Sequence, residues 1–135
     1  MNIQRKPRLL LVEDSLALTK VYKEYLKPMP VTVSSVAEGG LGLEQIEETD
    51  PDVVLLDLNL PDMNGLELLE KLQDLPQDPT VVVITSIGTV NTAVEAMRAG
   101  AFDFLQKPFD AERLRITVRN ALEKQDLKAL VKTYR

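Results

Sequence analysis

The stretch VVLLDLNLPDMNG, residues 53–65, carries the strongest pattern in the sequence. Four aliphatic residues lead directly into Asp57, and a segment rich in Pro, Asp, Asn and Gly follows. An aliphatic run without polar alternation is typical of a strand that is buried on both faces of a parallel sheet. The segment after it is typical of a turn. A carboxylate at such a junction can be a turn former, a metal ligand or a nucleophile, and the rest of the chain must decide which.

The same arrangement of a short aliphatic run followed by a helical pattern recurs along the whole chain. Further strands are predicted at residues 8–12, 31–36, 80–85 and, more weakly, 102–106. Apolar residues at three- and four-residue steps predict a helix after each strand. The first helix has one buried face formed by Leu18, Val21, Tyr22, Tyr25 and Leu26. The others are marked by Leu43 and Ile46, by the leucines between Leu66 and Leu72, by residues 91–99, and by Asp110, a candidate N-cap from which the fifth helix runs onward. Five strands alternating with five helices predict an α/β fold, with one five-stranded parallel sheet that is covered by helices on both faces.

Length and composition restrict the class of protein. With 135 residues and a net charge of −5, the chain is long enough for one domain and has no basic stripe for nucleic acid. The absence of cysteine excludes disulfides and thiolate metal sites, and the absence of histidine excludes His-based triads and His metal ligands. The apolar runs are too short to cross a bilayer, and acid at Glu13 interrupts any signal-peptide core. We therefore expect a cytoplasmic location, away from membranes.

Acidic side chains gather where two of the predicted strands end. Ligands of such sheets bind beyond the carboxyl ends of the strands, near the point where the strand order reverses. Glu13 and Asp14 follow the first strand and Asp57 ends the third. Three carboxylates with oxygen ligands alone suit Mg²⁺ better than zinc. Taken alone, Glu13 and Asp14 are better explained as acids that cap the first helix and interact favourably with its dipole.

Lys107 and Thr85 favour the functional interpretation. Lys107 precedes a proline, which keeps its backbone extended, so its ammonium can point along the sheet edge toward Asp57. Thr85 ends the fourth strand with a hydroxyl group. A carboxylate nucleophile, a divalent cation, an ammonium and a hydroxyl are the groups needed to accept a phosphoryl group. Each residue alone has an ordinary explanation, but their joint placement at strand ends indicates this chemistry.

The sequence resembles the receiver domain of two-component response regulators over roughly residues 8–123. The segments that carry the resemblance are LLLVEDS, VVLLDLNLPDMNGLELL, VVVITS and AVEAMRAGAFDFLQKPF. The resemblance implies a flavodoxin-like, doubly wound (βα)5 fold and a phosphoryl group transferred from a phosphohistidine donor to Asp57. It further implies that Mg²⁺ is bound by Glu13, Asp14, Asp57 and the backbone carbonyl of Asn59, that Thr85 and Lys107 contact the phosphoryl group, and that Phe104 is the switch aromatic.

The region around residues 88–122 is most similar to receivers of NtrC-type, LuxO-like, sigma-54-dependent transcriptional activators. In that subfamily an ATPase domain and a DNA-binding domain follow the receiver, yet this sequence contains no G-x-x-x-x-G-K-[ST] motif. We therefore expect a receiver domain at residues 1–123 and, at 124–135, a helical linker to an output domain that is absent from this chain. The implied partner is a sensor histidine kinase or a histidine phosphotransfer protein, and DNA would be reached only through the output domain.

The last predicted helix carries two apolar stripes that are out of phase. Leu114, Val118, Ala121 and Leu122 suit packing on the sheet, whereas a second stripe consists of Leu127, Leu130, Val131 and Tyr134. The second stripe is either a frayed amphipathic tail or a linker or dimerisation helix that leads to a domain absent from this chain.

Three other interpretations remain at this stage. A Mg²⁺-dependent aspartyl-phosphate hydrolase needs a second acid two positions after the nucleophile, where this chain has Asn59. A flavodoxin-like FMN carrier needs a phosphate loop rich in glycine and hydroxyl groups after the first strand, where VEDSLAL is acidic. A stand-alone receiver that acts through protein–protein contacts, even without phosphorylation, is the third. We expect a signalling domain rather than an enzyme.

Overall fold

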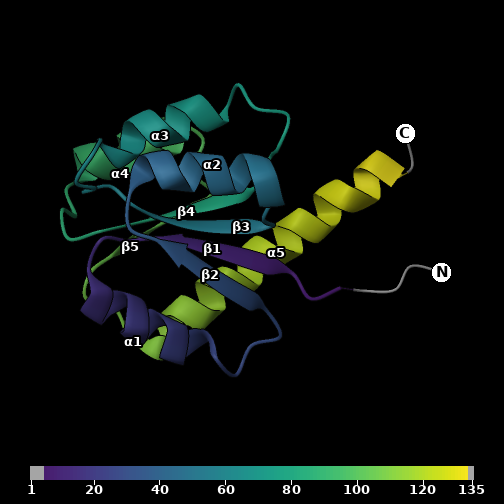
Figure 1. Ribbon diagram of the computed structural model, residues 1–135, viewed down its shortest axis with the longest axis horizontal. Helices are drawn as coiled ribbons and strands as arrows, with labels where there is room; N and C mark the ends of the chain where they lie inside the picture. The colour runs from purple at the N-terminus through teal and green to yellow at the C-terminus, as the bar shows by residue number, and fades with distance from the viewer. Residues whose placement is uncertain (1–4, 134–135) are drawn as a thin grey trace.

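The computed structural model describes residues 5–133 and contains one parallel sheet of five strands in the order β2-β1-β3-β4-β5 (Figure 1). The strands are β1 (Arg8–Val12), β2 (Thr32–Val36), β3 (Val53–Asp57), β4 (Thr80–Thr85) and β5 (Asp103–Gln106). The predicted parallel α/β architecture is confirmed, and the second and fifth strands each begin one residue later than predicted.

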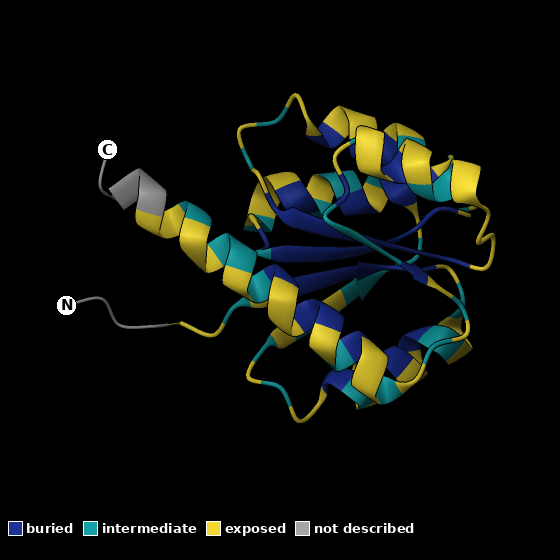
Figure 2. Cartoon of the chain, turned by 180° about the vertical axis from the view of Figure 1, so that it is seen from behind, coloured by how far each residue is buried: buried dark blue, intermediate teal, exposed yellow. Residues whose placement is uncertain are grey.

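Five helices cover the two faces of this sheet. They are α1 (Leu16–Leu26), α2 (Gly39–Thr49), α3 (Gly65–Leu72), α4 (Val90–Arg98) and α5 (Ala111–Thr133). Figure 1 shows α2, α3 and α4 on one face and α1 and α5 on the other. Each layer encloses its own apolar cluster, and together the two clusters bury the central strands, which are drawn dark blue in Figure 2.

Most helices begin at a side chain that caps the first turn. Ser15, Asn64 and Thr89 each accept a hydrogen bond from a backbone amide at the start of α1, α3 and α4. The predicted cap Asp110 also accepts one, from the amide of Arg113 at 2.8 Å. Such caps satisfy backbone donors that have no partner inside the helix, and the predicted cap at Asp110 is confirmed.

The strand order reverses between β1 and β3. From β1 the chain passes to β2 at one edge of the sheet, and then returns past β1 to continue through β3 and β4 to β5. Every residue of β3 is buried, and its neighbours in the sheet are β1 and β4. The carboxyl ends of β1 and β3 therefore lie side by side at the place where ligands of this fold class bind.

Helix α5 continues well past the part of it that covers the sheet. Leu114, Val118 and Ala121 are fully buried, which confirms the first stripe. Leu127 and Leu130 are 61% and 52% exposed. Of the rest of the second stripe, the side chain of Val131 and all of Tyr134 lie outside the described residues.

Polar contacts hold the helix to the domain beyond residue 123. The Thr80 hydroxyl donates to Gln125 Oε1 at 2.7 Å, and Lys128 Nζ lies 3.1 Å from the Asp78 carboxylate. Lys124 Nζ lies 5.3 Å from the centre of the Phe102 ring.

Within residues 5–133, no helix combines the length and the apolar character needed to cross a membrane. The cytoplasmic location and the domain boundary at residue 123 stay predictions.

Candidate phosphoryl-acceptor site

Three carboxylates meet at the carboxyl edge of the sheet, as predicted. In the sheet Val12 pairs with Leu56, so the residues that follow them, Glu13 and Asp57, emerge side by side. Both are buried, with 2% and 3% exposure, whereas Asp14 is exposed. One carboxylate oxygen from each of the three residues lies within 4.8 Å of the others. The cluster therefore has two buried members and one that faces solvent.

Lys107 supplies the positive charge at this cluster. Its Nζ atom donates to Glu13 Oε1 at 2.7 Å and to Asp57 Oδ2 at 2.9 Å. The backbone amide of Lys107 donates to the carbonyl of Thr85, which ties the segment after β5 to the end of β4. Burial alone would lower the pKa of Lys107, but the hydrogen bonds to Glu13 and Asp57 outweigh it and raise the pKa. The side chain is therefore a fixed cation at neutral pH.

Burial acts in the opposite sense on the acid beside it. The pKa of Glu13 is raised above its ordinary value because burial disfavours the carboxylate, and the negative charge of Asp57 adds to this. The hydrogen bonds from Lys107 and from the Ser15 amide offset part of the effect. Two buried carboxylates thus share one ammonium, which leaves the cluster with excess negative charge and open to a further cation.

An aromatic stack lies behind Lys107, and the sequence patterns did not reveal it. The rings of Tyr22 and Phe109 are 5.0 Å apart and nearly parallel, at 16°. Tyr22 is 3% exposed, and burial raises its pKa to about 12. Because Phe109 follows Lys107 by two residues, the stack fixes the turn after the lysine against α1. The apolar periodicity placed Tyr22 on a buried helical face but did not indicate which residue it contacts. The signal in the sequence for a partner was the aromatic residue Phe109, which follows Lys107 and its proline.

The loop from β3 to α3 closes around Asp57. The amide of Asn59 donates to Asp57 Oδ1 at 3.0 Å, and Asn59 forms an isolated antiparallel bridge with Asn64. The Gly65 amide donates to the carbonyl of Leu58 at 2.8 Å. This arrangement matches the predicted turn into the third helix. It orients one oxygen of Asp57 through the loop, while Lys107 holds the other.

Gly65 is required by the close approach of the loop to the strand. A Cβ atom there would lie 2.5 Å from the Asp57 carbonyl oxygen and 2.7 Å from Leu58 Cα, and both are backbone atoms. We expect Gly65→Ala to destabilise the domain by about 1–3 kcal/mol, since the strand and the helix must separate to admit the methyl group. Urea unfolding measures this, and an unchanged midpoint would contradict it.

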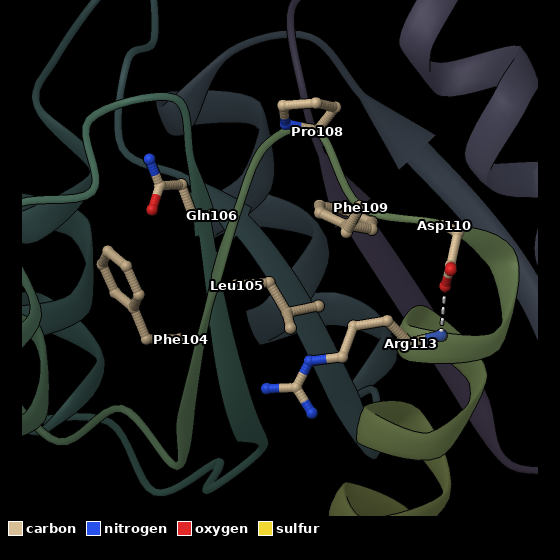
Figure 3. Close-up of a pocket in the computed structure, with 7 residues that line it drawn as sticks. All are labelled: Phe104, Leu105, Gln106, Pro108, Phe109, Asp110 and Arg113. Atoms are coloured by element: carbon tan, nitrogen blue, oxygen red, sulfur yellow. Dashed lines mark hydrogen bonds between the residues drawn. The ribbon is translucent and has the colours of Figure 1, made fainter.

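Thr85 ends β4, and Phe104 lies on the neighbouring strand β5, where it pairs with Val83. Thr85 is fully buried, and its Oγ1 accepts a hydrogen bond from the amide of Ile87 at 3.1 Å, which leaves the hydroxyl proton available to another acceptor. Phe104 is half-buried and packs against the apolar cluster on the α4 face. It also lines a groove of about 410 Å³ between β5 and α5, together with Gln106 and Arg113 (Figure 3).

The donor set of the acidic cluster fits a hard divalent cation. It offers carboxylate oxygens only, without nitrogen or sulfur ligands, and one of the three carboxylates faces solvent, so a bound ion would keep several waters. These are the preferences of Mg²⁺. Together with the ammonium of Lys107 and the hydroxyl of Thr85, the arrangement can stabilise the negative charge of a phosphoryl group in transfer.

Comparison with known proteins gives a consistent result. The family model of the response regulator receiver domain matches residues 9–119. The chain is 44% identical to the regulatory protein LuxO of Vibrio cholerae over 114 residues, which are 84% of this chain and 25% of LuxO. It is 35% identical to the chemotaxis protein CheY of Listeria monocytogenes over 118 residues, 87% of this chain and 96% of CheY.

A solved structure shows the same fold. The signal receiver domain of a LuxO-type protein from Vibrio parahaemolyticus superposes with a TM-score of 0.91 at 38% identity, over 94% of this chain and 98% of that one. The chain thus spans nearly all of the CheY relative and about a quarter of the LuxO relative.

Proposed function

Because the chain belongs to the response regulator receiver domain family, whose function is phosphoryl acceptance, we propose that Asp57 is its phospho-acceptor. The observation that carries the proposal is the position of Lys107 Nζ, which contacts the carboxylates of both Glu13 and Asp57. Because this ammonium already contacts the acceptor carboxylate, it can also bind the oxygens of a phosphoryl group that is transferred to Asp57. Because the chain contains no histidine, the phosphoryl group would come from an external donor, either a phosphohistidine on a kinase or phosphotransfer protein or a small acyl phosphate.

In the transfer step, one Asp57 oxygen attacks phosphorus in line with the phosphorus–nitrogen bond of the donor. The new bond to oxygen forms as the old bond breaks, and the electron pair of the old bond stays on the imidazole nitrogen. Lys107 neutralises charge on the phosphoryl oxygens. Glu13, Asp14, Asp57 and the carbonyl of Asn59 would hold Mg²⁺, which supplies further charge neutralisation at those oxygens when it is bound.

Phosphorylation would then change the surface around α4. It places nearly two negative charges where the Asp57 carboxylate carried one. The hydroxyl of Thr85 can then turn from the Ile87 amide toward a phosphoryl oxygen. The space that Thr85 leaves would let the half-buried ring of Phe104 move inward, and α4 would adjust with it. A partner that prefers this state shifts the population toward it.

The partners follow from this chemistry. A sensor histidine kinase or a histidine phosphotransfer protein would supply the phosphoryl group. The LuxO relative is about four times longer than the matched region, and by analogy with it the switch would control an output domain outside this chain. By relation to LuxO-like and NtrC-type activators, we infer that this output is sigma-54-dependent transcription, with DNA bound by the output domain. A stand-alone receiver that acts by protein contact is the alternative.

Acetyl phosphate tests the proposal against the hydrolase alternative. We expect the intact mass of the chain to increase by one phosphoryl group in the presence of Mg²⁺ and acetyl phosphate, and Asp57→Asn to show no increase. Asp74→Ala, which removes an exposed carboxylate after α3, should behave as the parent. Sustained turnover of a generic phosphate ester without a stable adduct would support a hydrolase instead.

The side chain of Ile87 is expected to slow the loss of the phosphoryl group. It is 47% exposed and follows Thr85 by two residues. By analogy with the receiver family, this position lies close to the approach of a hydrolytic water. An apolar side chain there impedes the water, so Ile87→Glu should shorten the phosphoryl lifetime by several-fold. Decay of the phosphorylated mass with time measures this. Equal lifetimes for parent and variant would show that Ile87 does not control the water.

The segment 124–135 is proposed as a linker that supports a homodimer. Leu127 and Leu130 expose an apolar stripe near the end of α5 that a second copy could cover. We expect the full chain to sediment partly as a dimer and a chain ending at residue 123 to sediment as a monomer. A monomer in both cases would exclude dimerisation through this segment.

A further inference from the structure

Helix α2 begins without a cap of its own. Its N-cap residue, Glu38, makes no side-chain capping hydrogen bond, and the first turn contains no acidic residue. A helix start with amides that lack partners is unfavourable, and acceptors normally come from the cap residue. Here the acceptor is distant in sequence. Asp62 Oδ1 accepts from the Gly39 amide at 2.8 Å, and Asp62 Oδ2 accepts from the Gly40 amide at 2.9 Å.

The two glycines allow this approach. A Cβ atom at Gly39 would lie 2.6 Å from Cγ of Met63, the residue that follows Asp62. A Cβ atom at Gly40 would lie 3.3 Å from Asp62 Oδ2. The same hydrogen bonds, from Gly40 and then from Gly39, lower the pKa of Asp62, so its carboxylate is the charged acceptor that a helix start favours. The helix thus contributes two glycines that leave room for the loop, and the loop contributes a charged carboxylate that accepts from both amides.

Asp62 belongs to the loop that surrounds the phospho-acceptor. Beginning at Asp57, this loop passes through Asn59, whose amide donates to Asp57, and returns at Gly65, whose amide donates to Leu58. Both of these contacts are at the base of the loop. Asp62 lies between them, and its two hydrogen bonds tie the tip of the loop to α2, beside the apolar packing of Leu60 and Met63.

We propose that Asp62 is a positioning residue, which clamps the β3–α3 loop to the start of α2 and thereby holds the Asn59 backbone where the cation is bound. This inference rests on the proposed function, because it concerns the geometry of the same site. Without these two hydrogen bonds, the tip of the loop would keep only its apolar contacts and would move over a wider range. The Asn59 carbonyl would then lose its fixed direction relative to Glu13, Asp14 and Asp57, and cation affinity would fall.

Two variants separate the hydrogen bonds from the charge. Asp62→Ala removes the charge and both acceptors, whereas Asp62→Asn removes the same charge and keeps one acceptor oxygen. Asp74→Ala is the matched control, since Asp74 is an exposed carboxylate after α3. The measurements are Mg²⁺ titration of the unphosphorylated chain and amide hydrogen exchange at Gly39, Gly40 and Asn59.

For Asp62→Ala we expect about tenfold weaker Mg²⁺ binding, the usual effect of losing a residue that orients a ligand. Exchange should become faster at all three amides. Asp62→Asn should lie between Asp62→Ala and the parent, and Asp74→Ala should match the parent. If Asp62→Ala speeds exchange at Gly39 and Gly40 but leaves Asn59 exchange and Mg²⁺ affinity unchanged, Asp62 is only a helix cap and the proposal is overturned.

Equal weakening in Asp62→Ala and Asp62→Asn without faster exchange would also overturn it, since charge alone would then explain the effect. Failure of the proposed function is recognised separately. In that case the unsubstituted chain itself neither binds Mg²⁺ nor takes up a phosphoryl group, whatever the variants do.

Discussion

Lys107→Met is expected to slow phosphoryl transfer from acetyl phosphate to Asp57 by about 10²–10³-fold, the usual cost of removing one fixed donor from developing negative charge. The ammonium contacts the acceptor carboxylate directly at 2.9 Å and is held by Glu13 at 2.7 Å, so it is in place before the donor arrives. Methionine retains the length and apolar stem of the side chain and removes the charge. The rate of mass increase in the presence of Mg²⁺ measures the effect.

The same substitution should also change stability, in a way that depends on pH. It leaves two buried carboxylates without their cation, and we expect a loss of about 3 kcal/mol at neutral pH. The raised pKa of Lys107 means that its contribution is complete below the ordinary value of 10.5 and is lost as the pH rises through the raised value. On the acid side, the loss should shrink as Glu13 takes up a proton. Urea unfolding of the parent and the variant across the pH range tests both the expected change at alkaline pH and the expected change at acidic pH.

Lys20→Met is the matched control, because it makes the same chemical change at an exposed position of α1. It should leave the transfer rate and the pH dependence of stability close to those of the parent. A Lys107→Met variant that is phosphorylated at the parental rate would contradict the role given to the ammonium.

Removal of divalent cations with a chelator is expected to reduce phosphoryl acceptance by about 10³-fold or more, since a metal ion at transferring oxygens contributes several kcal/mol. Asp14→Asn should weaken Mg²⁺ binding, because it removes one of the three clustered carboxylates. Affinity should also fall as the pH is lowered. Burial raises the pKa of Glu13 above 4.5, so a proton competes with the cation at higher pH than at an ordinary glutamate.

Calorimetric titration of Mg²⁺ at several pH values measures this, with Asp74→Ala as the control for general loss of negative charge. Acceptance that persists at the full rate in excess chelator would contradict the proposed role of the cation. Affinity that is constant down to the ordinary pKa of a glutamate would contradict the effect of burial on Glu13.

The sequence alone predicted the strands and the residues at their ends, for a physical reason. Strands that are buried in a parallel sheet consist of continuous aliphatic runs. The residue at the end of such a run therefore lies at the carboxyl edge of the sheet. This placed Glu13, Asp57 and Thr85 together, and the proline after Lys107 indicated where its ammonium could point. The structure brings the lysine into contact with Asp57, as expected, and also with Glu13, which was not predicted.

Contacts between distant segments could not be predicted in the same way. The stack of Tyr22 on Phe109 joins α1 to the turn after β5, and neither periodicity nor spacing encodes which aromatic rings meet. The bond from Asp62 to the start of α2 is a similar case, because an N-cap is sought in the adjacent sequence. The ligand role of the Asn59 carbonyl stays a prediction, as does the switch role of Phe104.

The position of the phosphoryl group on the chain is the most direct test of the central claim. The full chain would be incubated with a phosphohistidine donor protein and Mg²⁺, then digested, and the modified peptide would be identified by tandem mass spectrometry. We predict a single phosphoryl group, on Asp57. Modification at another residue of the parent chain, or undiminished modification of Asp57→Asn, would contradict the account.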